Sequence, residues 1–333
     1  MGILVMYPGP SRVKKAISFE TLENVTFMKI LVATEKPFAK AAVDGIREIV
    51  EGAGYELALL EKYADKAELL AAVADADGLI VRSDKVTREV IDAARNLKIV
   101  VRAGAGYDNV DLAACTERGI VVMNTPGQNS NAVAELVVSM MIFISRNQFT
   151  PGTGAEVSGK RLGIHAYGNV GRIVARYGRA LGMSVKAFDP FVDPRQLEAD
   201  GVEAVGTVEE LYASSDYVSL HIPATAQTRG SIGYELLSSM PKGGVLINTA
   251  RKEVIDEQGL IRAFEERADL KYITDIAAEA QPLLTEKLGK RVFATPKKMG
   301  AETAEANLNA GLAAARQTVD FLKNGNRRFQ VNK

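Results

Sequence analysis

Short apolar runs alternate with segments of helical periodicity along nearly the whole chain from Met28 onward. In the first part, compact apolar runs predict strands at residues 29–34, 55–60, 78–81, 99–103 and 120–124. Helices are predicted between them at residues 39–52, 66–74, 87–94 and 111–118, with Thr87 as the N-cap of the third. Because strands and helices alternate strictly, this part is expected to form a parallel sheet with helical crossovers.

The second part repeats this alternation after a helix that lacks a polar face. Residues 132–146 (AVAELVVSMMIFISR) are apolar on nearly every side, so this helix is expected to be buried between domains or against another subunit. A linker rich in Gly, Thr and Pro follows at residues 148–158. Further strands are predicted at residues 162–165, 185–188, 217–221, 245–249, 272–275 and 292–294, with helices between most of them, including 256–267. These elements complete a second doubly wound sheet, and a final helix at 303–323 follows, with Asn324–Gly325 as its C-cap.

Residues 161–189 carry the clearest functional pattern, in the order strand, glycine turn, helix, strand and acid. This is the order of a dinucleotide-binding βαβ unit, in which phosphates lie at the helix N-terminus. Gly168 and Gly171 match the second and third glycines of G-x-G-x-x-G, whereas Ala166 replaces the first. Asp189 lies 18 residues after Gly171, where a carboxylate accepts ribose hydroxyls and repels a 2′-phosphate. The pattern therefore predicts NAD rather than NADP.

Composition narrows the class of protein. The 333 residues are 47% hydrophobic and 25% charged, with 41 basic and 41 acidic side chains, which favours a globular protein without affinity for nucleic acid or an anionic membrane surface. A single cysteine, Cys115, fits a reducing cytoplasm, and no apolar run is long enough to span a membrane. No metal site is predicted. Residues 1–27 match no signal-peptide pattern, and we expect the fold to begin at Met28 with this leader outside it.

From Met28 to Lys333 the chain resembles the D-2-hydroxyacid dehydrogenase family, and within it the enzymes that act on 3-phosphoglycerate. The resemblance rests on the glycine-loop unit and on these stretches: LIVRSDKVT (79–87), VRAGAGYDNVDLAA (101–114), NTPGQNSNAVAEL (124–136), LHIPAT (220–225), INTARKEVID (247–256), TDIAAEAQP (274–282) and TPKKMGAETAEAN (295–307). It implies an α/β protein with two doubly wound, Rossmann-like parallel-sheet domains. An NAD domain (128–301) is inserted into a flavodoxin-like substrate domain (28–127 plus 302–333), and dimers form through the NAD domain.

The resemblance also assigns site residues by position. The cofactor set is Ala105, Tyr167, Gly168, Asn169, Val170, Asp189, His221, Ile222, Pro223, Thr228, Thr249, Ala250, Arg251, Asp275 and Gly300. The substrate set is Arg82, Ser83, Arg102, Ala103, Gly104 and Asn129. Arg251 follows a predicted strand directly, and its guanidinium suits a clamp for the carboxylate of a 2-hydroxy acid.

The base of the reaction departs from the family pattern. The family supplies a histidine in T-P-H-x-G, paired with a glutamate, whereas this chain has TPKKMGAET. Counting from either side places Lys297 or Lys298 at the histidine position. A free lysine is protonated at neutral pH, so it needs a desolvated, cationic surrounding to act as a base. Glu279 is the nearest candidate for the glutamate. His165 is expected to be structural, and His221 is the main rival for the base.

Positive charge favours a phosphorylated substrate. Arg82, Lys85 and Arg102, with Lys252 directly after Arg251, exceed what a single carboxylate needs. The leading hypothesis is therefore NAD-dependent oxidation of 3-phosphoglycerate to 3-phosphohydroxypyruvate, the entry step to serine, without the serine-sensing domain of longer relatives. Alternatives are another 2-hydroxyacid dehydrogenase, such as a glyoxylate or hydroxypyruvate reductase, and an NAD-sensing binding protein of the corepressor type.

Overall fold

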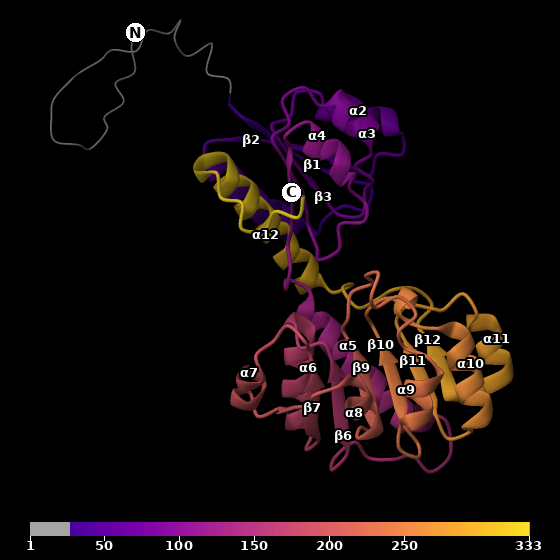
Figure 1. Ribbon diagram of the computed structural model, residues 1–333. Helices are drawn as coiled ribbons and strands as arrows, with labels where there is room; N and C mark the ends of the chain where they lie inside the picture. The colour runs from indigo at the N-terminus through magenta and orange to yellow at the C-terminus, as the bar shows by residue number, and fades with distance from the viewer. Residues whose placement is uncertain (1–26, 333) are drawn as a thin grey trace, which may run out of the picture. The chain divides into compact units, whose positions relative to one another are not determined.

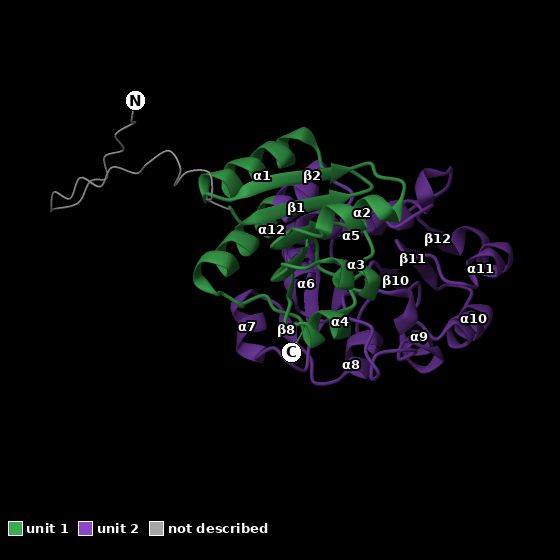
Figure 2. Cartoon of the chain, turned by 90° about the horizontal axis from the view of Figure 1, so that it is seen from above, with its two compact units in different colours: residues 1–124, 312–333 green, residues 125–311 purple. Residues whose placement is uncertain are grey.

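This computed structural model describes residues 27–332, so the expected leader falls outside the described residues apart from Phe27. The chain divides into two compact units (Figure 2). The first unit comprises residues up to Asn124 together with those from Leu312 on, and the second comprises Thr125–Gly311. The second division falls within helix α12 (Ala304–Asn324).

The first unit is built on a five-stranded parallel sheet in the order β2-β1-β3-β4-β5, the flavodoxin-like order. The strands are β1 (Lys29–Thr34), β2 (Glu56–Glu61), β3 (Gly78–Val81), β4 (Ile99–Arg102) and β5 (Val121–Asn124). Between them run α1 (Lys40–Gly52), α2 (Lys66–Val73), α3 (Arg88–Ala93) and α4 (Leu112–Glu117).

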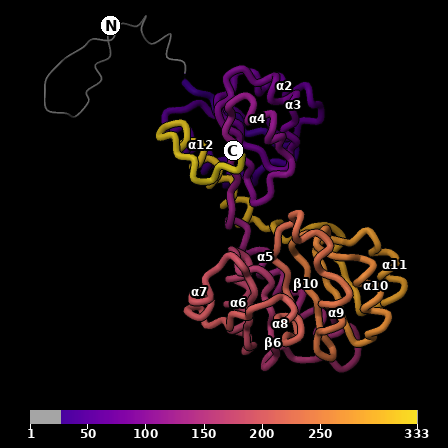
Figure 3. The backbone as a smooth tube through the Cα atoms, viewed as in Figure 1, coloured from indigo at the N-terminus to yellow at the C-terminus, as the bar shows by residue number. Residues whose placement is uncertain are grey.

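The C-terminal helix belongs to this first unit over its second half. Two glycines permit its close approach, because a Cβ at Gly45 or Gly78 would lie 2.5 Å from Leu312 or 2.9 Å from Thr318. The yellow helix accordingly lies beside the indigo and violet N-terminal elements in Figure 3. Gly325 ends it with φ +68°, as expected for a C-terminal cap.

The second unit contains a seven-stranded parallel sheet in the order β12-β11-β10-β9-β6-β7-β8 (Figure 1). Its strands are β6 (Arg161–His165), β7 (Ser184–Phe188), β8 (Glu203–Ala204), β9 (Tyr217–Leu220), β10 (Val245–Asn248), β11 (Lys271–Thr274) and β12 (Val292–Ala294). Its other helices are α5 (Ser130–Ser145), α6 (Asn169–Ala180), α7 (Pro194–Ala199), α8 (Val208–Ala213), α9 (Tyr234–Ser239), α10 (Glu257–Glu266) and α11 (Gln281–Leu288). The strand order reverses between β6 and β9, and ligands bind beyond the carboxyl ends of the strands at such a switch point.

The predicted α/β fold with two doubly wound parallel sheets is confirmed. The pattern did not predict β8, because a strand of two residues leaves no periodic signal. Thr87 occupies the N-cap position of α3, but its hydroxyl makes no capping hydrogen bond. The apolar helix α5 places Val137, Met141 and Ile144 in the core of the second unit, which accounts for much of its apolar surface. Among residues 27–332, no helix combines the length and apolar character needed to cross a lipid bilayer.

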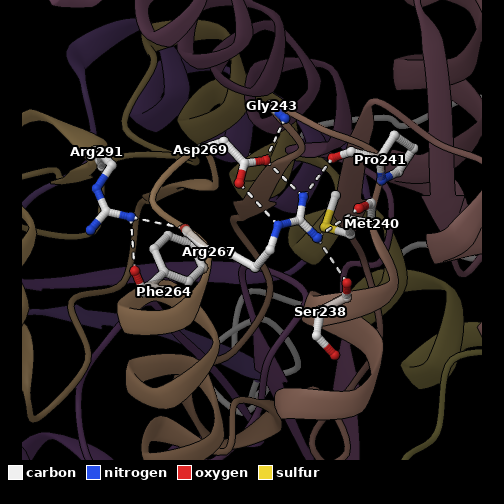
Figure 4. A network of polar contacts seen from close by, with 8 residues as sticks. All are labelled: Ser238, Met240, Pro241, Gly243, Phe264, Arg267, Asp269 and Arg291. Atoms are coloured by element: carbon white, nitrogen blue, oxygen red, sulfur yellow. Dashed lines mark hydrogen bonds and ion pairs between the residues drawn. The ribbon is translucent and has the colours of Figure 1, made fainter.

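A polar network around Arg267 and Asp269 (Figure 4) joins the segments that precede β10 and β11. It therefore lies at the amino ends of these strands, opposite the edge that carries the switch point. The Arg267 guanidinium donates to both carboxylate oxygens of Asp269 at 2.9 and 2.7 Å and to the carbonyl oxygens of Ser238 and Met240 at 2.8 and 3.1 Å. The backbone N–H of Gly243 donates to Asp269 at 2.7 Å. Arg267 holds the pKa of Asp269 well below its usual range, so both side chains are charged. The pair stabilises the loops at the amino ends of the strands.

Candidate active site

The glycine turn after β6 forms an open helix N-terminus. The chain leaves the strand through Ala166, which has φ +78°, and enters α6 at Gly168. No side chain caps this helix, so its first N–H groups are available to an anion. Gly171 is required at its position, since a Cβ there would lie 2.3 Å from the Ala166 carbonyl oxygen. Asn169 and Val170 are the first two residues of the helix, and their contact with a pyrophosphate stays a prediction.

Asp189 closes this turn from the end of β7. Its Oδ2 accepts a hydrogen bond from the Tyr167 N–H at 2.8 Å, and its Oδ1 accepts one from the Phe191 N–H at 2.9 Å. Each carboxylate oxygen retains a lone pair for a hydroxyl donor. The Tyr167 side chain is buried and donates to Asp200 at 2.9 Å, so Tyr167 offers the site its backbone rather than its ring.

Unpartnered polar atoms lie at the carboxyl ends of β9 and β10. His221 Nε2 and Thr249 Oγ1 are buried and have no hydrogen-bond partner. Burial lowers the pKa of His221 to about 3, with a further contribution from His165, so its imidazole is neutral and a weak base. The Thr228 hydroxyl donates a hydrogen bond to the Pro223 carbonyl oxygen at 2.5 Å. Six other buried side-chain atoms of the described residues also lack a partner, so these two atoms offer polar groups at this edge but do not by themselves mark a ligand site.

Arg251 follows β10 and is held by its neighbours. The buried side chain of Asn248 accepts from the Ala250 N–H at 2.9 Å and donates to the Arg251 carbonyl oxygen at 3.0 Å. The guanidinium itself donates to the Ala250 carbonyl oxygen at 2.8 Å. Arg251 is half-buried at the carboxyl edge of the sheet, where its remaining donors suit a carboxylate.

Glu279 forms an ion pair with Lys252, with 2.9 Å between Oε1 and Nζ. The pair raises the pKa of Lys252 and lowers that of Glu279. Glu257 holds the same segment, because its carboxylate accepts from the backbone N–H groups of Glu279 and Ala280 at 2.8 and 2.9 Å. Lys252 and Glu279 therefore partly neutralise each other.

The two candidate lysines lie on a loop that Asp275 anchors. Asp275 is 1% exposed, and it accepts from Thr295 Oγ1 and from the N–H groups of Met299 and Gly300, each at 2.8 Å. Lys297 and Lys298 lie between these anchors, and both are exposed. A buried carboxylate thus fixes both ends of the segment that carries the lysines.

The first unit holds a separate cationic cluster at the carboxyl ends of β3 and β4. Arg82 donates to the Lys36 carbonyl oxygen at 3.1 Å, and its guanidinium lies 5.3 Å from the Phe38 ring centroid. Arg102 Nε donates to the Arg82 carbonyl oxygen at 2.9 Å. The Arg102 guanidinium folds over Gly104, where a Cβ would lie 1.6 Å from its Nη1. The structure therefore places both arginines together.

The remaining predicted residues differ in their exposure. Ser83 and Ala105 are exposed in the first unit, and Ala103 is buried there. In the second unit, Asn129 precedes α5 without capping it, and Ile222 is buried. Sequence patterns missed Asp84 and Thr295, whose roles depend on contacts with residues distant along the chain. Among the described residues, no group of three or more His, Cys, Asp or Glu side chains is arranged to hold a metal ion.

Comparison with known proteins identifies the family to which the chain belongs. Residues 31–332 match the family model described as D-isomer specific 2-hydroxyacid dehydrogenase, catalytic domain. The chain is 38% identical over 276 residues to a D-3-phosphoglycerate dehydrogenase from Methanocaldococcus jannaschii, covering 78% of this chain and 52% of that protein. It therefore spans about half the length of that relative. It is 36% identical to a hydroxypyruvate reductase from Thermotoga maritima, covering 77% of this chain and 88% of that protein.

A solved structure extends the comparison. The NAD+-bound 3-phosphoglycerate dehydrogenase of Entamoeba histolytica is 52% identical, with a TM-score of 0.83, covering 92% of this chain and 99% of that one. Because this match spans both units and nearly all of the other chain, the likeness is not confined to the nucleotide-binding fold.

Proposed function

Because the chain belongs to the D-isomer specific 2-hydroxyacid dehydrogenase family, we propose that it catalyses the NAD-dependent oxidation of 3-phosphoglycerate to 3-phosphohydroxypyruvate, the first step of serine biosynthesis. One observation carries the proposal. The uncapped N-terminus of α6, Asp189 and Arg251 all lie at the carboxyl edge of one parallel sheet. That edge combines an anion site, a ribose acceptor and a carboxylate clamp.

The residues present fit NAD. The α6 N-terminus suits the pyrophosphate, and Asp189 suits the ribose hydroxyls while repelling a 2′-phosphate. The unpartnered His221 Nε2 and Thr249 Oγ1 supply polar groups further along the same edge. When bound, NAD supplies the acceptor for the hydride that leaves C2 of the substrate.

The chain's own residues bind and orient the substrate and take up the proton. Arg251 would bind the carboxylate through parallel N–H donors and hold the C2 hydroxyl in a fixed orientation. Lys297 or Lys298 would accept the hydroxyl proton during oxidation, or donate it in the reverse direction. Because both side chains are exposed, either lysine can act as a base only if bound substrate and NAD exclude water from it. The Asp275 anchors favour this role because they fix both ends of the lysine loop.

The phosphate is assigned to cationic groups of the first unit. Arg82 and Arg102 form a cluster held by backbone contacts, and guanidinium groups are well suited to bidentate phosphate binding. Lys252 is expected to contribute less to phosphate binding than its charge alone suggests, because its ion pair with Glu279 already neutralises part of that charge. Glu279 is accordingly a weaker candidate for partner of the base than for partner of Lys252.

A second candidate is reduction of hydroxypyruvate or glyoxylate. The specific observation in its favour is the hydroxypyruvate reductase of Thermotoga maritima, of which the match covers 88%. An NAD-sensing binding protein without turnover is a third hypothesis, motivated by the replacement of the family histidine. We further propose a cytoplasmic homodimer formed through the second unit, for which sedimentation of the purified protein is the test.

Turnover with matched substrates tests these proposals. The purified chain is assayed with NAD and 3-phosphoglycerate, D-glycerate or D-lactate, and with NADH and hydroxypyruvate or glyoxylate. The highest kcat/KM is expected for 3-phosphoglycerate, and Arg251→Gln should abolish most of it. Lys297→Ala, Lys298→Ala and His221→Asn are compared separately, and a rate loss confined to His221→Asn would exclude the lysines as the base. NAD binding without turnover of any 2-hydroxy acid would favour the binding-protein hypothesis.

A further inference from the structure

A buried carboxylate in the first unit joins three strand ends. Asp84 is 4% exposed and follows β3. Its Oδ1 accepts from the Glu35 N–H at 2.7 Å and from the Tyr63 hydroxyl at 2.9 Å, and its Oδ2 accepts from the Arg82 N–H at 3.3 Å. Glu35 follows β1 and Tyr63 follows β2, so one side chain links the carboxyl ends of three adjacent strands.

This arrangement fixes the backbone of Arg82, to which the Arg102 side chain is hydrogen-bonded. Asp84 holds the Arg82 N–H, and the Arg82 carbonyl oxygen in turn accepts from Arg102 Nε at 2.9 Å. Asn109 Nδ2 donates to the Asp84 carbonyl oxygen at 2.7 Å and braces the same turn. A shift of this turn would therefore displace both guanidinium groups together.

Burying a carboxylate is costly unless several donors satisfy it, and such a group is replaceable by apolar packing where stability alone is at stake. Three donors satisfy the Asp84 carboxylate, and through the Arg82 N–H it also positions Arg82 and Arg102. Apolar packing could not replace this second role. We propose that Asp84 is a positioning residue for anionic substrate binding: it sets the arrangement of Arg82 and Arg102 that receives the phosphate. This inference rests on the proposed function and deepens it, because it assigns substrate affinity to a residue that does not itself attract an anion.

If Asp84 positions the arginines, its substitution should change the KM for the substrate and leave kcat nearly unchanged. If Asp84 only supports the fold, no such selective change in KM is expected. Asp84→Asn keeps the size of the side chain but turns an N–H₂ group toward donors, so at least one of the three hydrogen bonds is lost. We expect the KM for 3-phosphoglycerate to rise about tenfold, with kcat and the KM for NAD within about twofold of wild type. Tyr63→Phe removes a single donor without changing packing and should raise the same KM about threefold. The second variant keeps the inference testable if the first fails to fold.

Asp77→Asn is the matched control at the opposite edge of the same sheet. Asp77 accepts from the Lys29 N–H and from Lys98 Nζ, both at 2.9 Å, and so also links strand ends. It should lower stability without changing the KM for 3-phosphoglycerate. Equal KM changes in Asp77→Asn and Asp84→Asn, or no change in either Asp84→Asn or Tyr63→Phe, would overturn the inference. If the wild type turns over only another 2-hydroxy acid, the proposed function fails, and the inference survives only if that acid carries a phosphate and shows the same split between KM and kcat. Absence of all turnover would overturn both.

Discussion

Ala166 occupies a backbone conformation that favours glycine, which makes Ala166→Gly an informative substitution. With φ +78°, the residue lies in the left-handed region, where an L-residue is strained by roughly 1–2 kcal/mol. Glycine removes the strain but costs about 0.5–1 kcal/mol in the entropy of the unfolded chain. The half-buried Ala166 methyl also packs against the core, which reduces the gain further. Taking the middle of these ranges, we expect a net stabilisation of about 0.5 kcal/mol, or roughly 1–2 °C in Tm for a unit of this size.

Gly243→Ala provides the inverse control in the same unit. Gly243 has φ +80°, and a Cβ there would meet nothing within 4 Å, so the substitution introduces the same strain without a clash. It should destabilise by about 1 kcal/mol. The measurement is urea unfolding followed by circular dichroism, with a thermal scan as a second observable. If Gly243→Ala is destabilising while Ala166→Gly leaves the unfolding free energy unchanged or lower, strain at Ala166 is not a net cost and the reasoning is wrong.

Three further outcomes are expected. Asp275→Asn should speed hydrogen exchange of the Gly300 amide by at least about tenfold and lower turnover, because it weakens the hydrogen bonds that anchor the loop of Lys297 and Lys298. Unchanged exchange would contradict the anchoring role of Asp275. Arg267→Gln should lower the free energy of unfolding by roughly 2–4 kcal/mol, measured by urea unfolding. In the wild type, the stabilisation that comes from the lowered pKa of Asp269 should be lost as pH falls below the ordinary carboxyl range. Burial lowers the pKa of His165 to about 4 and that of His221 to about 3, so both histidines bind a proton first in the unfolded chain as pH falls below about 6.5. Each should lower stability by on the order of 3 kcal/mol between pH 6.5 and 4, and His165→Gln should lack its share of this loss.

The sequence alone determined the class of fold and the order of its elements. Strands such as β1, β3 and β12 coincide with their predicted bounds, because a buried parallel strand leaves a short, uninterrupted apolar run. The glycine turn and Asp189 were predicted because their chemistry depends on spacing within one βαβ unit. Even the departure at Ala166 was visible, although its positive φ was not.

Only the tertiary structure decided which distant residues act together. Asp84 joins Glu35 and Tyr63, and Asp275 anchors Thr295 and Gly300, through pairings that no local pattern encodes. The structure likewise paired Glu279 with Lys252, whereas residue types alone suggested a partner for the catalytic base. The physical reason is that helical and strand periodicity reports which face of an element is buried, while the partner of a buried carboxylate depends on how strand ends meet across the folded sheet.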